Sequence, residues 1–115
     1  MATNSIAKEK SMAFSIRIVR LYKYLTDEQK EYVLSKQLLR CGTSVGANVA
    51  EAIYGSSRKD FVAKLQIALK ECAETLYWIE LLHSCEYLST AMFQSLFDDC
   101  EEIRKILVSS VKSSQ

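Results

Sequence analysis

Apolar side chains recur every three or four residues along most of the chain, which is the period of an α-helix that buries one face. The pattern is interrupted at three places, so it predicts four helices, over residues 5–25, 30–54, 58–84 and 90–111. The residues predicted to form the buried stripes of these helices are Phe14, Ile18, Leu21, Leu25, Leu34, Leu38, Cys41, Val45, Ala52, Phe61, Leu65, Ala68, Cys72, Ile79, Leu82, Phe93, Leu96, Cys100, Ile103 and Leu107.

The segments between these helices are short, and short connections make consecutive helices antiparallel. The sequence therefore predicts an all-α fold, an antiparallel up-and-down four-helix bundle that occupies residues 1–115 as a single domain. Ser57, with Asp60 three residues later, and Ser89 are predicted to cap the third and fourth helices. The chain has no proline and only three glycines, which argues against an all-β fold because hairpins need frequent turn residues.

Composition adds little to this fold but restricts the class of protein. Hydrophobic residues make up 49% and charged residues 25% of the chain, as in ordinary globular proteins. There is no apolar run of about 18 residues, so no membrane span is expected. The first ten residues lack the apolar segment of a signal peptide, which predicts a cytoplasmic protein.

Residues that commonly carry catalysis are sparse. The four cysteines (Cys41, Cys72, Cys85 and Cys100) form no CxxC pair, and we interpret them as reduced, mostly buried residues and not as disulfides or metal ligands. Glu80-Leu-Leu-His83 matches one of the two Glu-x-x-His motifs of a di-iron bundle, but His83 is the only histidine. The sequence thus predicts a protein that is not an enzyme and has no metal or cofactor.

The segment over residues 40–51 is unusual for the middle of a helix. Gly42 and Gly46 each cost about 1 kcal/mol relative to alanine there, and with Ala50 they form a stripe of small residues at intervals of four. We interpret the stripe as close packing against a helix of the same chain or of the next subunit; the alternative is a groove for a ligand or a nucleic-acid backbone. The predicted helix-packing and oligomer motif comprises Gly42, Ser44, Gly46, Asn48 and Glu51.

Polar residues on the second and third helices are predicted to meet inside the bundle. Asn48 lies on the stripe of Cys41 and Val45, so its amide needs a partner, such as Ser44 or a group on the third helix. The residues predicted to form a buried polar layer are Glu71, Glu74 and Trp78. We expect one of the two glutamates to meet Arg40, Ser44 or Asn48.

Charge is unevenly distributed, although the net charge is only +1. Residues 1–70 contain 12 Lys and Arg against 6 Asp and Glu, whereas residues 71–115 contain 3 against 8. Such asymmetry indicates either complementary charges between helices or subunits, which we favour, or an electropositive face for an anionic partner. The residues assigned to a nucleic-acid-binding face are Lys10, Arg17, Arg20, Lys23, Arg40, Arg58 and Lys59.

Three segments carry a resemblance to a known family. Residues 40–51, the pattern Ile18-Val-Arg-Leu-Tyr22, and six positions of the third helix resemble the bacterial four-helix bundle family of 23S rRNA intervening-sequence proteins. This family is related to the accessory protein of diversity-generating retroelements, and the resemblance covers roughly residues 10–108. The six positions are Phe61, Lys64, Leu65, Ala68, Glu71 and Trp78.

The resemblance implies a homo-oligomeric ring, a pentamer, with no enzymatic activity. It also implies contact with RNA or DNA or with another protein, because the retroelement relative is a pentamer that binds nucleic acid and a reverse transcriptase. The expected function is therefore a non-catalytic oligomeric scaffold or adaptor that contacts RNA or DNA through a basic face. The alternative is a protein–protein interaction module that binds no nucleic acid.

Overall fold

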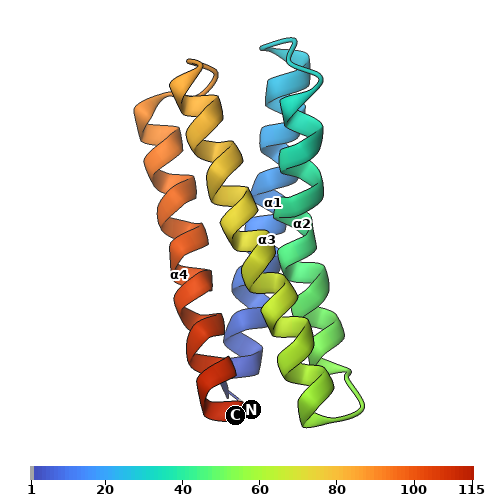
Figure 1. Ribbon diagram of the computed structural model, residues 1–115. Coiled ribbons are helices and arrows are strands. Elements are labelled where there is room, and N and C mark those ends of the chain that lie inside the picture. The colour runs from blue at the N-terminus through green and yellow to red at the C-terminus, as the bar shows by residue number, and fades with distance from the viewer. Residues whose placement is uncertain (1) are drawn as a thin grey trace.

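The computed structural model describes residues 2–115, with side chains from residue 5 onward, and these residues form four helices (Figure 1). The helices are α1 (Ala2–Asp27), α2 (Leu34–Ile53), α3 (Arg58–Ser84) and α4 (Thr90–Ser114). They run up and down in an elongated antiparallel bundle of 43 × 21 × 19 Å, which confirms the predicted fold class. The α2–α3 contact is the most extensive and the α1–α4 contact the least. No helix in the described part of the chain is long and apolar enough to cross a lipid bilayer.

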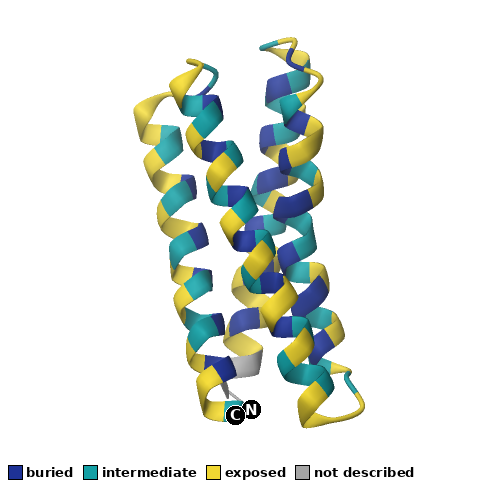
Figure 2. Ribbon diagram, viewed as in Figure 1, coloured by how far each residue is buried: buried dark blue, intermediate teal, exposed yellow. Residues whose placement is uncertain are grey.

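The core follows the predicted apolar stripes. Buried residues line the inward side of every helix (Figure 2). Three predicted core residues near helix ends, Leu34, Phe61 and Phe93, are only partly buried. Conversely, Thr75 was not predicted to be buried but is fully so, because its hydroxyl donates to the Glu71 carbonyl oxygen at 2.7 Å and leaves only a methyl group to pack.

The third helix has the bounds that the sequence predicts, and both predicted caps are present. The Ser57 hydroxyl accepts the Asp60 backbone N–H at 3.0 Å, and the Ser89 hydroxyl accepts that of Met92 at 3.1 Å. Each serine thereby satisfies a donor that has no partner within its helix. Local sequence alone is sufficient to define these two helix starts.

The predicted start of the second helix, at residue 30, is wrong by four residues. Lys30 has a φ of 56°, which no residue inside a right-handed helix adopts. Instead, the Glu31 carboxylate accepts three backbone N–H groups, from Val33 at 2.9 Å, Leu34 at 2.9 Å and Ser35 at 2.7 Å. Glu31 is only 7% exposed, so this buried carboxylate forms the cap from which α2 begins.

The outer helices are longer than predicted. The first extends from Ala2 to Asp27 instead of 5–25, and the last continues to Ser114 instead of ending at residue 111. Hydroxyl groups near these ends donate back into their own helices: Thr26 to the Tyr22 carbonyl at 3.0 Å and Ser113 to the Ser109 carbonyl at 3.0 Å. These residues therefore remain within the helix instead of ending it.

Candidate functional site

The glycines of the 40–51 segment pack against α1 of the same chain. A Cβ atom on Gly42 would lie 2.8 Å from Ile18 Cγ1, and one on Gly46 would lie 2.9 Å from Ser15 Oγ and 3.2 Å from the Ser11 carbonyl oxygen. Only glycine allows α2 to approach α1 so closely at these two positions. The packing interpretation of these glycines therefore fits the structure within a single protomer.

The three polar residues of that motif, Ser44, Asn48 and Glu51, have different surroundings. The amide of buried Asn48 donates to the carbonyl oxygen of Ser44 at 2.9 Å and to its hydroxyl at 3.1 Å, so its partner lies on its own helix. Glu51 lies on the surface, where its carboxylate is 3.3 Å from the ammonium of Lys64 on α3. The Asn48 amide N–H groups and the Glu51 carboxylate thus each have a partner within the chain.

The α2–α3 face carries a charged cluster made of Arg40, Glu71, Glu74 and Trp78. The Arg40 guanidinium donates to the Glu74 carboxylate and lies 3.4 Å from that of Glu71, while the Trp78 indole N–H donates to Glu74 at 3.0 Å. The expected meeting of Arg40 with the glutamates is thus present. The predicted layer is only partly buried, however: the side chains of Glu71 and Glu74 are 18% and 36% exposed, and Trp78 is half-buried.

These contacts change the acidity of the cluster. The hydrogen bond from Arg40, followed by that from Trp78, holds the pKa of the Glu74 carboxyl below its ordinary value of 4.5. The hydrogen bond with Glu74 raises the pKa of Arg40. Both shifts favour the charged pair at neutral pH.

We expect the Glu74 contribution to stability to be lost in acid. A lowered folded-state pKa stabilises the protein above pH 4.5 and does so progressively less as pH falls through the folded value. Replacing Glu74 by glutamine should therefore lower the free energy of unfolding at neutral pH, by less than about 1 kcal/mol because the pair is solvated. This difference from the wild type should disappear at acidic pH.

Urea unfolding at several pH values measures this difference. Glu80→Gln is the matched control, because Glu80 is an exposed carboxylate of the same helix with no ion pair among the described residues. If the loss of unfolding free energy in Glu74→Gln stayed constant from neutral to acidic pH, it would contradict a stabilising role of the charged Glu74 carboxylate.

The contact between α1 and α4, called here the α1–α4 seam, joins the basic part of the sequence to the acidic part. Lys10 pairs with Glu102 at 2.7 Å, and Arg17 pairs with Asp99 while also donating to the Ser95 carbonyl at 3.4 Å. With the Arg40 cluster, these contacts pair the two oppositely charged halves inside one chain. They support the interpretation of the asymmetry as complementary charges between helices.

The residues assigned to nucleic acid do not converge on one surface of the protomer. Lys10, Arg17 and Arg40 are engaged with carboxylates. The other four, which have no ion pair among the described residues, occupy opposite ends of the bundle (Figure 1). Two, Arg20 and Lys23, lie near the end of α1, and two, Arg58 and Lys59, lie in the first turn of α3.

An exposed apolar strip on α1 was missed by the sequence reasoning. Met12, Ile16 and Val19 are 59%, 45% and 38% exposed, at intervals of four and three residues that place them on one helical face. The strip continues onto α2, because Met12 shares a shallow hollow of about 250 Å³ with Ala47 and Ala50. The apolar spacing of these α1 residues was a readable signal, but the buried stripe of Phe14 and its neighbours masked it.

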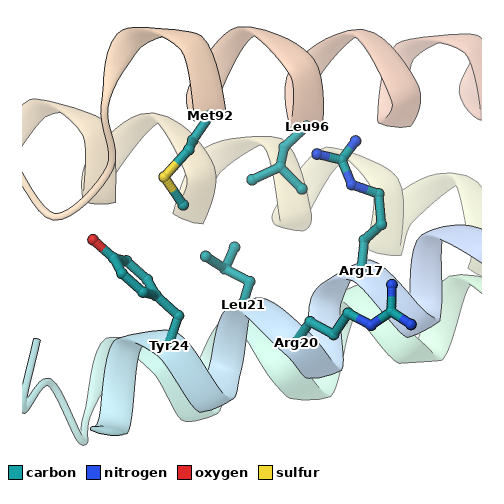
Figure 3. Close-up of a pocket in the computed structure, with 6 residues that line it drawn as sticks. All are labelled: Arg17, Arg20, Leu21, Tyr24, Met92 and Leu96. Carbon is teal, nitrogen blue, oxygen red and sulfur yellow. The ribbon is translucent and has the colours of Figure 1, made fainter. Parts of the chain in front are cut away.

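A second hollow lies on the other edge of α1, against α4. It has a volume of about 320 Å³ and is shown in Figure 3. Its lining residues are Arg17, Arg20, Leu21, Tyr24, Met92 and Leu96.

Residues with catalytic or ligating potential are dispersed. Cys41, Cys72 and Cys100 are buried free thiols and Cys85 is exposed. Burial raises the pKa of Cys41 to about 11, so this thiol is protonated at neutral pH and is a poor nucleophile. His83 stacks on Phe93 with ring centroids 4.4 Å apart. Among the described residues, no group of three or more His, Cys, Asp or Glu side chains is arranged to hold a metal ion.

The fold and these surfaces define a small helical-bundle protein whose distinctive features are helix-packing glycines, paired charges and an exposed apolar strip. The chain belongs to the 23S rRNA-intervening sequence protein family, whose model matches residues 3–109. This match confirms the resemblance carried by the 40–51 segment. A comparison with curated proteins finds no match.

A similar solved structure supports the same assignment. It is a protein with unknown function from the S23 ribosomal protein family of Bacteroides thetaiotaomicron VPI-5482. The two sequences are 52% identical, the match covers 96% of this chain and 98% of that chain, and the TM-score is 0.95.

Proposed function

We propose that this protein is a non-catalytic, homo-oligomeric scaffold that assembles through the apolar strip of α1 and α2. The observation that carries the proposal is the exposure of Met12, Ile16 and Val19 on one face. Contiguous exposed apolar surface of this kind is a common mark of protein–protein contact. The small residues Ala47 and Ala50 beside the strip leave room for a neighbouring helix to approach.

The assembly that we propose is a closed ring, as the family resemblance implies, with five subunits. A strip that meets a different surface of the next copy makes a head-to-tail contact, and such contacts close into a ring when the rotation between copies divides a full turn. The strip faces away from the α1–α4 seam, so assembly leaves that seam and its ion pairs in place.

Nucleic-acid binding is the second part of the proposal. Its support is that Arg20, Lys23, Arg58 and Lys59 keep their charges free of carboxylates within the described chain. Two cations at each end of a protomer give weak affinity alone, but a ring repeats them and adds avidity. A partner protein bound by the ring is the alternative, and it requires none of these cations.

Solution mass by light scattering tests the assembly. We expect the wild type to have the mass of several chains and Ile16→Glu to have the mass of one, because a carboxylate in the middle of an apolar interface is desolvated without a partner. Ile67→Glu is the matched control, since Ile67 is similarly exposed, at 40%, but lies on α3. A monomeric wild type, or equal dissociation of both variants, would refute the strip as the assembly surface.

The same measurement with a mixed RNA and DNA oligonucleotide, at low and moderate salt, separates the two partner classes. A particle that gains mass and loses it as salt rises supports phosphate contacts, because these release counterions. An oligomer that ignores the oligonucleotide at both salt concentrations favours the protein adaptor.

A further inference from the structure

The hollow between α1 and α4 has the layout of a small ligand site. Figure 3 shows Leu21 facing Met92 and Leu96 across its apolar middle. Tyr24 lies at one end, and Arg17 and Arg20 lie at the other. Its volume of about 320 Å³ falls at the lower end of the range for small-molecule pockets.

The polar groups around this apolar middle all offer hydrogen-bond donors. The Tyr24 hydroxyl accepts a hydrogen bond from the Gln29 side-chain amide at 2.7 Å, so its own proton remains free to donate. Arg17 is held by Asp99, whereas Arg20 has no ion pair among the described residues. A ligand that complements this rim therefore carries acceptors, and beside Arg20 a negative charge is favoured.

We propose that the α1–α4 hollow binds a small amphiphilic anion, a ring-sized apolar body that carries one carboxylate or phosphate. The apolar body displaces water from Leu21, Leu96 and the adaptable side chain of Met92. The anionic group pairs with the Arg20 guanidinium, whose planar fork matches carboxylate and phosphate oxygens. The site is independent of the proposed assembly, because the hollow lies on the α4 edge of α1 and the strip lies toward α2.

The test compares two probes that share an apolar body, 1-naphthoate and the neutral 1-naphthamide, by NMR titration of the full-length protein. We expect the amide signals around the hollow to shift with both probes. The carboxylate should bind about threefold to fivefold more tightly at low salt, the effect of one exposed ion pair. This preference should decrease as salt screens the charge.

Three variants test whether the probes bind at this hollow and whether Arg20 causes the preference for the carboxylate. Arg20→Gln should remove the preference for the carboxylate, whereas Arg58→Gln, with the same change in net charge at the other end of the bundle, should keep it. Met92→Trp should fill the hollow and weaken both probes, with no change of charge. Circular dichroism establishes that each variant remains folded.

A fourth variant, Asp99→Asn, should bind naphthoate more tightly than the wild type. Removing this carboxylate frees Arg17 for the ligand, so the naphthoate affinity should rise about threefold, the effect of a second exposed pair. Asp98→Asn is its matched control, because Asp98 is a neighbouring exposed carboxylate that accepts a hydrogen bond from Gln94 and pairs with no arginine among the described residues. Equal gains in the two variants would indicate a general charge effect and overturn the site.

Two further results would overturn the proposal. One is equal affinity for naphthoate and naphthamide at every salt concentration. The other is a response of the hollow to a short oligouridylate with none to naphthoate, which would assign this surface to nucleic acid.

Discussion

Replacing Glu31 by alanine is expected to lower the free energy of unfolding by about 3 kcal/mol, because it removes a buried, charged cap at the start of α2. The carboxylate accepts three backbone N–H groups at the start of α2, at 2.7–2.9 Å, and is almost wholly buried. Alanine leaves these donors without partners and also removes a negative charge from the positive end of the helix dipole. Equilibrium urea unfolding followed by circular dichroism measures the loss.

The neighbouring residue Glu28 supplies the control for this prediction. It is exposed on the same connection and accepts none of these bonds, so Glu28→Ala should change stability by less than about 0.5 kcal/mol. Glu31→Gln should fall between the two, since the amide keeps one acceptor oxygen but loses the charge. Equal stability of Glu31→Ala and Glu28→Ala would show that the cap contributes nothing.

Replacing Gly42 by valine is expected to destabilise the bundle by about 3 kcal/mol or more. The Cβ alone would lie within 3.0 Å of three atoms of Ile18, whose side chain is fully buried in the close-packed core. The two γ-methyl groups of valine add further overlap, so α1 and α2 must separate. Thermal and urea unfolding both report this loss.

A double-mutant cycle identifies the cause. Gly42→Val combined with Ile18→Ala should be less destabilised than the sum of the single variants, because alanine vacates the space that valine needs. Ala63→Val, at an exposed position of α3, measures the helix-propensity cost of valine relative to alanine where no clash occurs; relative to glycine, valine carries no such cost. Simple additivity of Gly42→Val and Ile18→Ala would show that the two side chains do not compete for space.

The ion pairs between helices determine which basic residues remain available to a partner. Lys10, Arg17 and Arg40 hold neighbouring helices together, so they stabilise the fold and have little charge left for a partner. Arg20 lies on α1, as Lys10 and Arg17 do, but has no such pair among the described residues. The proposed anion site and the proposed nucleic-acid contact both depend on that difference.

Local pattern and chain connectivity were sufficient for the architecture. The four helices, their antiparallel order, the buried stripes and the caps at Ser57 and Ser89 follow from helical spacing and short connections, which act within one or two turns of the chain. The start of α2 was not predictable in this way. Glutamate is not among the favoured capping residues, and Glu31 acts as one only because the chain turns at Lys30 and buries the carboxylate.

The amino-acid sequence by itself determined the family, the all-α class and the small-residue stripe of α2. Only the tertiary structure decided that Gly42 and Gly46 meet α1 of the same chain and that the basic residues divide into paired and unpaired groups. It also decided that Met12, Ile16 and Val19 are left uncovered. The physical reason is that helical spacing determines which residues share a face, whereas the rotation of each helix about its axis determines what that face meets. That rotation is set jointly by the packing of all four helices.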